Sequence, residues 1–269
     1  MNVRSVLSQA IKQLNNHLEA EILLSHVLHV TRSSLLAWPE KLLTPDQVMH
    51  YHSLVIRRLR HEPIAYITGY KEFWSLELEV NEHTLIPRPE TELLVELVLH
   101  HLPAQVIDLG TGSGAIALAI AHECPQCQVL ATDCSDQALN VARRNAQRLN
   151  IPNVEFLLSN WCQQLGEKIV QVIVSNPPYI ADQDIHLTQG DVKYEPRLAL
   201  IGGKDGLVAL SEIIRCAKNH LIKHSGWLFL EHGYQQGKNV RLLFEEEGYK
   251  MVRSYLDDFG IERVTGGKI

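Results

Sequence analysis

The sequence predicts an α/β protein with a doubly wound sheet of seven strands, preceded by a small helical bundle and a linking β-hairpin. From residue 105 onward, short β-branched runs alternate with helical patterns, which indicates a parallel sheet with crossover helices. The last two predicted strands are separated only by residues 256–260, too few for a helix, so the last strand should run antiparallel. Residues 1–70 instead carry apolar residues at helical spacing.

The pattern of residues 1–70 predicts helices joined by short polar segments. Helices are expected at residues 3–14, 18–28 and 45–59, and Thr44 before Pro45 is typical of a helix start. Residues 72–80 alternate apolar and polar side chains and should pair as a strand with residues 84–86. We therefore expect a helical domain over residues 1–75 and an α/β domain over residues 76–269.

The α/β part divides into regular units. Residues 87–92 should open a helix that runs to about residue 101. Strands are expected at residues 106–107, 128–132, 154–158, 169–174, 227–230, 249–255 and 261–265. Further helices are expected at residues 115–122, 135–149, 207–222 and 235–246.

Composition and charge favour an ordinary cytoplasmic protein. The chain has 269 residues, of which 45% are apolar and 21% charged, and its net charge is −6. No apolar run approaches the roughly 20 residues that span a bilayer, and no signal peptide is evident. The acidic balance argues against stable nucleic-acid binding, and residues 57–60 are interpreted as a solvated basic helix face. We expect the protein to be a monomer.

The cysteines do not indicate a disulfide framework, because there are five of them in a chain of cytosolic type. Cys124 and Cys127 have CxxC spacing, but they follow a predicted helix, whereas a redox pair opens one. A zinc site would need further ligands than His122 and Cys134, its sequence neighbours. We interpret the pair as structural and expect no metal.

A glycine-rich turn follows the first strand of the α/β part. Its glycines allow a tight turn and close approach of a ligand, and the Lys-Ser/Thr of a triphosphate loop is missing. Asp133 ends the next strand and suits the two hydroxyls of a ribose, in either NAD or S-adenosylmethionine. The turn consists of Gly110, Thr111, Gly112, Ser113 and Gly114.

Two residues favour S-adenosylmethionine over NAD. A carboxylate at Asp108 would repel a pyrophosphate but not an ammonium or sulfonium group. Trp161, after the third strand, could lie against an adenine face. The alternatives are that Asp108 only orients the loop and that Trp161 only packs in the core.

A second turn, Asn176-Pro177-Pro178-Tyr179, ends an apolar strand, because proline cannot continue a central strand. The Asn176 side-chain oxygen and the Pro177 carbonyl can accept both hydrogens of a planar NH₂ group. Such bonds localise the nitrogen lone pair, and Tyr179 can stack on the group. Direct transfer of a methyl group to that nitrogen then requires the nitrogen, the methyl carbon and the sulfur to be aligned. Hydrogen bonds that strengthen in the transition state would lower the barrier further. Asn176, Pro177 and Tyr179 are therefore the predicted catalytic residues, with Pro178 completing the substrate grip.

Residues 87–92 contain two prolines around Arg88. One interpretation is a helix start with acidic residues at its positive end. The other is a rigid lip over the site, with Arg88 and Glu90 pointing inward.

These motifs resemble a known family. The loop D-L-G-T-G-S-G, the strand-ending Asp133, the Asn160-Trp161 pair and S-N-P-P-Y-I are similar to class I S-adenosylmethionine-dependent methyltransferases. The segments I-P-R-P-E-T-E, Y-E-P-R-L-A-L and G-G-K-D-G resemble the protein-(glutamine-N5) methyltransferases that modify peptide chain release factors. The family often has Asp where this chain has Asn160.

The resemblance implies a Rossmann-like methyltransferase sheet that uses S-adenosylmethionine and releases S-adenosylhomocysteine. The residues implied to contact this molecule are Gly110 to Gly114, Asp133, Trp161 and Asn176. Asn176 to Tyr179 would hold the glutamine of a Gly-Gly-Gln loop in class I bacterial release factors. The helical domain would dock that protein.

Other functions share the same chemistry. A sister enzyme could modify a glutamine of a ribosomal protein, and adenine-N6 methylation of nucleic acid would use a similar NH₂ grip. Adenine methylation predicts a basic groove, which the charge disfavours. A module that only binds S-adenosylmethionine would not need Asn-Pro-Pro-Tyr intact.

Overall fold

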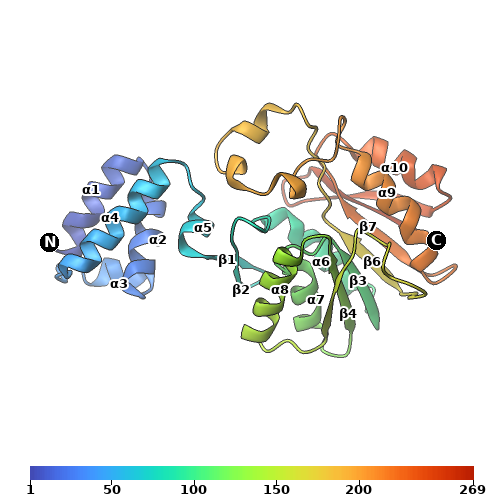
Figure 1. The fold of residues 1–269 in the computed structure, drawn as a ribbon, viewed down its shortest axis with the longest axis horizontal. Coiled ribbons are helices and arrows are strands. Elements are labelled where there is room, and N and C mark those ends of the chain that lie inside the picture. The colour runs from blue at the N-terminus through green and yellow to red at the C-terminus, as the bar shows by residue number, and fades with distance from the viewer. The chain divides into compact units, whose positions relative to one another are not determined.

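The computed structural model describes residues 1–269, which form two compact units (Figure 1). One unit consists of Met1–Tyr70 with Gly190–Tyr194. The other consists of Lys71–Gln189 and Glu195–Ile269. The second unit contains both of the turns that carry the predicted chemistry.

The first unit is a helical bundle. Thr44 caps its longest helix in a reciprocal capping box with Gln47, and Pro45 occupies the first turn, so the predicted start is confirmed. The core includes Leu23 and Tyr51, whose hydroxyl donates to the Ala20 carbonyl at 3.0 Å. The helices are α1 (Val3–Leu14), α2 (His17–Leu28), α3 (Arg32–Ala37), α4 (Pro45–Leu59) and α5 (Ile64–Thr68), of which α3 and α5 are too short to have been predicted from periodicity.

The basic run at residues 57–60 is not simply a solvated face. The Arg58 side chain is only 16% exposed and pairs with Glu19 at 2.8 Å and with Asp191 at 2.6 Å. Arg57 pairs with Glu62. The prediction was wrong for Arg58, because its partners Glu19 and Asp191 are brought in by the fold from distant parts of the sequence, whereas Arg57 keeps 41% of its side chain exposed and pairs with a near neighbour.

The linking hairpin differs from its prediction. Strands β1 (Tyr70–Phe73) and β2 (Leu76–Glu79) form a two-stranded sheet. The turn falls at Trp74 and Ser75, with φ of 52° and 59°. The predicted single strand over residues 72–80 is therefore wrong, and residues 84–86 form no strand. Alternation alone did not reveal a two-residue turn that lacks the usual Gly or Asn.

The seven-stranded sheet has the order β5-β4-β3-β6-β7-β9-β8. Strand β9 is antiparallel to both of its neighbours, as predicted, and the pairs among β3 to β7 are parallel. The fourth strand starts at Val172, later than predicted, and Val170 forms only an isolated bridge. The strands are β3 (Gln105–Leu109), β4 (Gln128–Asp133), β5 (Val154–Leu158), β6 (Val172–Ser175), β7 (Trp227–Glu231), β8 (Lys250–Leu256) and β9 (Glu262–Lys268).

Helices and short turns connect these strands. The predicted helix over residues 207–222 ends early, at Ala217, and continues as the 3₁₀ turn η5 (Lys218–His220). No helix is long and apolar enough to cross a membrane. The α-helices are α6 (Glu92–His100), α7 (Ala115–Glu123), α8 (Asp136–Arg148), α9 (Val208–Ala217) and α10 (Gly237–Glu246). The remaining 3₁₀ turns are η1 (Pro89–Thr91), η2 (Ile185–Thr188), η3 (Val192–Tyr194) and η4 (Arg197–Ala199).

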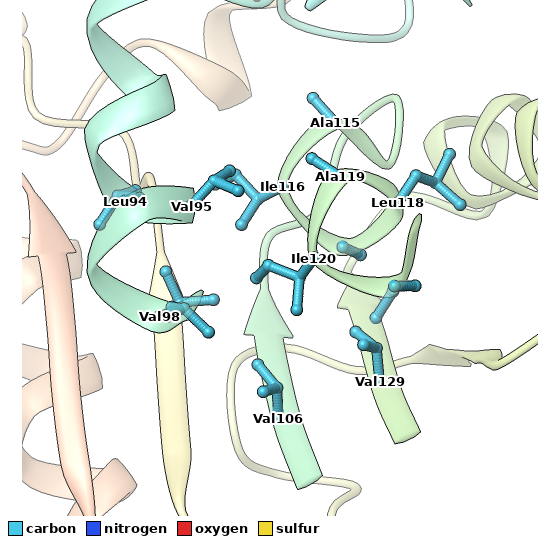
Figure 2. Packing of buried hydrophobic residues seen from close by; sticks show 14 of the residues in the cluster. Leu94, Val95, Val98, Val106, Ala115, Ile116, Leu118, Ala119, Ile120 and Val129 are labelled. Atoms are coloured by element: carbon cyan, nitrogen blue, oxygen red, sulfur yellow. The ribbon is translucent and has the colours of Figure 1, made fainter. Parts of the chain in front are cut away.

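Both faces of the sheet are covered. In Figure 2, side chains of α6 and α7 pack over Val106 of β3 and Val129 of β4. The next residues along the strands, Ile107 and Leu130, belong to the opposite cluster with α9 and α10. Burial on both faces explains the near-continuous apolar runs of these strands. Only the ends of the strands remain for a ligand site.

The sheet has a switch point between β3 and β6. From β3 the chain moves outward through β4 and β5, and it then returns to β6 on the other side of β3. The two strands are parallel, with Asp108 opposite Val174. The turns that begin at Gly110 and Asn176 therefore leave the sheet at the same edge, where open α/β sheets bind ligands.

One pair of cysteines is bonded, which corrects the expectation from the sequence. Cys162 follows β5 and is linked to Cys216 of α9, with Cα atoms 6.0 Å apart. The residues are 54 positions apart, so only the packing of α9 against the sheet brings them together. Cys124 and Cys127 are free and buried, and burial raises the pKa of the Cys127 thiol to about 12.

Candidate functional site

A cavity of about 420 Å³ lies at the C-terminal edge of β3, β4, β5 and β6. Ligand sites commonly have this size. Its wall brings together both predicted turns and the residues that follow β4 and β5. Among the predicted residues, the wall contains Gly110, Thr111, Gly112, Ser113, Asp133, Trp161, Asn176 and Pro178.

The glycine turn folds tightly against β4. The backbone N–H groups of Gly110 and Thr111 both donate to the Thr132 carbonyl at 2.8 Å. Gly110 has φ of 75°, and a Cβ there would come within 3.3 Å of the Trp161 ring. Gly110 therefore keeps the backbone open beside the indole.

Gly114 has a different role from the other residues of the turn. It does not line the cavity, and its φ is 86°. A Cβ there would meet Leu118 at 3.0 Å and Ala142 at 3.2 Å. The absence of a side chain at Gly114 thus allows α7 to start close to α8.

Asp108 is buried beneath the glycine-rich turn and does not face the cavity. Its side chain is fully buried, is absent from the cavity wall, and accepts the Thr111 hydroxyl at 2.7 Å. Burial raises the pKa of the Asp108 carboxyl to about 7, and Oδ1 has no hydrogen-bond partner. This geometry favours the interpretation that Asp108 orients the loop.

Asp133 and Trp161 stand on the cavity wall. Asp133 Oδ2 accepts the Gly112 N–H and Oδ1 accepts the Ser135 N–H, both at 2.9 Å. Burial raises the pKa of this carboxyl, while these bonds oppose the rise. The Trp161 indole N–H donates to Glu212 of α9 at 3.1 Å, which fixes the ring. Asn160 also lines the cavity.

The second turn is tied to its surroundings by side-chain hydrogen bonds. The Ser175 hydroxyl donates to the Leu109 carbonyl at 2.6 Å, joining the ends of β6 and β3. The Asn176 amide Nδ2 donates to Thr91 Oγ1 at 3.1 Å, and the Tyr179 hydroxyl donates to Glu231 Oε1 at 3.2 Å. Asn176 and Pro178 reach the cavity wall, whereas Pro177 and Tyr179 lie outside it.

The glycine-rich segment after η4 packs directly on this turn. A Cβ on Gly202 would lie 2.5 Å from the Pro178 carbonyl oxygen, and a Cβ on Gly206 would lie 2.1 Å from that of Tyr179. Gln236 Nε2 donates to the Tyr179 carbonyl at 3.1 Å. The rigidity of the turn therefore depends on contacts far away in the sequence.

The lip residues are held by a buried carboxylate. Arg88 pairs with Glu195, whose side chain is fully buried and whose Oε2 accepts the Ile86 N–H at 3.0 Å. Arg88 and Glu90 do not line the cavity, but Thr91 does. The segment is thus both a helix start and part of the site, with Thr91 rather than Arg88 or Glu90 at the wall.

Sequence reasoning missed Thr91 and Glu231. The signal for Thr91 was its place in the I-P-R-P-E-T-E segment. The signal for Glu231 was a charged residue at the end of an apolar strand, and its side chain is buried. Neither signal identifies the hydrogen-bond partner. Thr91 lies in η1 and Glu231 ends β7, whereas their partners Asn176 and Tyr179 lie in the turn after β6.

The cavity fits S-adenosylmethionine. The glycine turn leaves room beside the Trp161 ring, where a Cβ would intrude. Asp133 keeps further carboxylate lone pairs for hydroxyl groups. Asn176 adds an amide at the same wall. A seven-stranded sheet with the last strand antiparallel and these two turns at its switch point defines a methyltransferase of the S-adenosylmethionine-dependent class.

Comparison with known proteins supports this class and narrows it. Residues 5–69 match the family model "PrmC N-terminal domain", and residues 89–192 match "Methyltransferase small domain". A methyltransferase from Pyrococcus furiosus of known structure shares the fold, with a TM-score of 0.56, 22% identity, and coverage of 80% of this chain and 98% of that one.

Two relatives match over essentially their whole length. The release factor glutamine methyltransferase of Aliivibrio fischeri is 44% identical, covering 100% of this chain and 98% of that protein. The enzyme of the same name from Escherichia coli is 46% identical, covering 99% of this chain and 97% of that protein. The chain belongs to the release factor glutamine methyltransferase family. Family and fold together imply that its methyl donor is S-adenosylmethionine.

Proposed function

We propose that this protein transfers a methyl group from S-adenosylmethionine to the side-chain amide nitrogen, N5, of a glutamine in bacterial class I release factors. The glutamine is that of the Gly-Gly-Gln motif. The family membership supports the substrate class, since the relatives are named for it. The geometry at Asn176 supports the chemistry.

Asn176 carries the proposal. Its Nδ2 is engaged by Thr91, so Oδ1 is the atom left to accept a hydrogen bond from a substrate. The Pro177 carbonyl is predicted as the second acceptor; Pro177 adjoins Asn176 but is not itself part of the cavity wall. Two acceptors on one NH₂ group localise the nitrogen lone pair, and both bonds strengthen as positive charge develops on nitrogen. The stacking predicted for Tyr179 is not supported by the cavity, whose wall does not include this residue; its hydroxyl instead ties the turn to Glu231.

The donor would be held by residues on the other side of the same cavity. Gly110, Gly112 and Asp133 form its cradle, and Trp161 lies beside it. When bound, S-adenosylmethionine supplies an electrophilic methyl group on a sulfonium. The chain's own residues align the amide nitrogen and exclude water, which lowers the entropic part of the barrier. The proton leaves the nitrogen for solvent after transfer.

The helical part is proposed to dock the release factor. The proposed domain spans residues 1–75, and the family model for residues 5–69 supports a separate unit there. Its surface carries exposed apolar side chains such as Trp38, at 70%, and Leu42, at 77%. These side chains are available for contact with a protein partner.

The proposed substrate is tested by methyl transfer from radiolabelled S-adenosylmethionine. Purified protein is incubated in parallel with unmodified release factor, ribosomal protein and DNA. We expect label in the release factor, and none in a release factor whose Gly-Gly-Gln glutamine is replaced by alanine. Label in DNA or ribosomal protein alone would refute the proposal. The competing substrates share the planar NH₂ chemistry, so only this side-by-side assay separates them.

A further inference from the structure

The disulfide between Cys162 and Cys216 adjoins two residues of the cavity wall. Cys162 follows Trp161 in the chain, and Cys216 lies one turn of α9 after Glu212. Trp161 and Glu212 line the cavity, whereas neither cysteine does. The Trp161 indole N–H donates to Glu212 Oε2 at 3.1 Å. Two successive residues after β5 are thus attached to one face of α9, the first by a hydrogen bond and the second by a covalent bond.

Trp161 needs such support because its backbone is strained. Its φ is 47°, in the left-handed region that bulky side chains rarely adopt. A residue keeps this conformation only where its surroundings fix it. The Ser159 hydroxyl donates to the Trp161 carbonyl at 2.7 Å, and the Gln164 N–H donates to the same hydroxyl at 3.2 Å. These local bonds and the two attachments to α9 together hold the indole at the cavity wall.

The disulfide stands alone among the cysteines of this chain. Cys124, Cys127 and Cys134 are free. In cytosolic chains, the class that the sequence predicts, a disulfide is usually transient and catalytic or redox-sensing. The position of this one, beside the cavity wall, makes a reversible bond consequential for whatever the cavity binds.

The two sulfur atoms differ in their access to a reductant. Cys162 is buried, whereas Cys216 is partly exposed. A thiolate of a dithiol therefore attacks Sγ of Cys216, and Cys162 leaves as a thiolate. The second thiol of the reductant then attacks the mixed disulfide and releases Cys216. Two electrons and two protons pass to the protein, which gains two thiols while the dithiol becomes a cyclic disulfide.

We propose that Cys162 and Cys216 form a reversible redox site that controls the affinity for S-adenosylmethionine. In the bonded form, the pair fixes Trp161 against α9, which also contributes Val208 and Ala209 to the cavity wall. A dithiol opens the bond, and the strained Trp161 segment then leaves the wall for part of the time. The inference rests on the donor site of the proposed function and does not depend on the release factor.

The first measurement establishes the bond in solution. Protein purified without reductant and exposed to air should contain three free thiols, and dithiothreitol should raise the number to five. Peptide mass spectrometry of the oxidised sample should show Cys162 linked to Cys216. Absence of this link under oxidising conditions would overturn the inference.

The second measurement compares the dissociation constant for S-adenosylmethionine in the two forms by calorimetry. If the reduced segment occupies its position at the wall for about a tenth of the time, the constant increases about 10-fold on reduction. The bonds of Ser159 remain, so binding should weaken without being lost. Hydrogen exchange should become faster at the Gln163 and Leu165 N–H groups, which follow Trp161. A lower unfolding temperature with an unchanged dissociation constant would show a purely structural bond and overturn the inference.

Variants assign the effect to the right cysteines. Cys216→Ser should bind S-adenosylmethionine like the reduced wild type and should no longer respond to dithiothreitol. Cys134→Ser is the matched control, because Cys134 is a free cysteine at the cavity wall. It should keep the disulfide and the roughly 10-fold response. A response that persists in Cys216→Ser, or that disappears in Cys134→Ser, would overturn the inference.

The outcomes separate this inference from the proposed function and from misfolding. If neither form of the wild type bound S-adenosylmethionine, the proposed function would fail together with the inference. If both forms bound it equally and methylated release factor, only the redox inference would fail. Thermal unfolding reports the folding of each variant. Should Cys216→Ser not fold, the comparison of oxidised and reduced wild type, which needs no substitution, decides the question.

Discussion

The proposed mechanism divides single side chains at the cavity wall into those that would hold the substrate amide and those that would hold the donor. Asn176 is proposed for the first group, because its Nδ2 donates to Thr91 and leaves Oδ1 as an acceptor. Asp133 is proposed for the second, next to the Gly112 and Ser135 N–H groups that its carboxylate accepts. Substitutions of the two should therefore affect different measured quantities.

Asn176→Ala should abolish methyl transfer while the protein remains folded. Alanine removes the acceptor that activates the amide nitrogen, and the loss of one such group typically costs about 10²- to 10³-fold in kcat. Single-turnover transfer to release factor measures the effect, and thermal unfolding is the control. Full activity in this variant would exclude the two-acceptor mechanism.

Asp133→Ala should chiefly weaken donor binding. The variant loses the hydroxyl acceptors and also the bonds that order the glycine turn. We expect the dissociation constant for S-adenosylmethionine, measured by calorimetry, to increase by about 10- to 100-fold. An unchanged dissociation constant would count against the assignment of Asp133 to the ribose.

Asp108→Asn should stabilise the protein at high pH. Burial raises the pKa of Asp108 to about 7, above its ordinary value of 3.8. The folded state then keeps a proton that the unfolded state loses, so the free energy of unfolding falls as pH rises between these values. Asparagine carries no charge and avoids this loss. The expected gain is on the order of 1 to 3 kcal/mol at pH 8.

Urea unfolding at pH 8 and at pH 4 measures this effect. The gain should be much smaller at pH 4, where the unfolded carboxyl is about half protonated. Asp258→Asn, at an exposed position, is the matched control and should change little. Equal gains at both pH values would show that the effect does not come from ionisation.

At the scale of elements, the Asn-Pro-Pro-Tyr turn depends on a segment that is distant in sequence. Gly202 and Gly206 approach its carbonyl oxygens too closely for any side chain. Ile180 N–H donates to the Leu200 carbonyl, and Gly202 N–H donates to that of Ile180, both at 2.9 Å. The turn is thus clamped from outside as well as from Thr91 and Glu231.

Gly206→Ala should disturb this clamp. Its φ is 75°, and the added Cβ would lie 2.1 Å from the Tyr179 carbonyl oxygen. We expect a loss of stability of about 3 kcal/mol or more, together with a reduced kcat. Gly248→Ala is the control, because its φ is 89° but a Cβ there meets nothing within 4 Å.

The control should show only the backbone strain, about 1 to 2 kcal/mol, with kcat unchanged. Chemical denaturation and steady-state kinetics on both variants separate the effect of backbone strain from that of the steric contact between the added Cβ and the turn. Equal effects in the two variants would contradict the clamp.

At the scale of the whole molecule, chemistry and docking should be separable. The cavity and both turns belong to the unit made of Lys71–Gln189 and Glu195–Ile269. The proposed docking function belongs to the helical part. In the proposed mechanism the cavity takes up only the glutamine side chain, whereas docking uses the folded release factor.

A short peptide containing Gly-Gly-Gln should therefore be a poor but genuine substrate. We expect its kcat/KM to lie at least about 100-fold below that of the intact release factor, because the peptide lacks the docking contacts and must be ordered on binding. Methylation kinetics of the two substrates with the complete enzyme provide the measurement. Equal values of kcat/KM would argue against a docking role.

Most of the fold could be predicted because local sequence patterns specify its helices and strands. The strand at residues 154–158 was predicted at its observed bounds, and the start of α4 followed from Thr44 and Pro45. The hairpin was predicted in the wrong place, because the turn at Trp74 and Ser75 has no glycine or asparagine to mark it. The Cys162–Cys216 bond could not be predicted, because its two residues meet only in the fold.

The sequence by itself determined that two turns, at Gly110 and at Asn176, interrupt an α/β pattern with the chemistry of methyl transfer to a planar amine. Glycine and proline act locally, so their positions can be read without a structure. Only the tertiary structure decided that Asp108 is buried under the loop, that Thr91 accepts from Asn176 and that Glu231 accepts from Tyr179. The contacts of Asn176 and Tyr179 join elements more than 50 residues apart, and no local pattern specifies them.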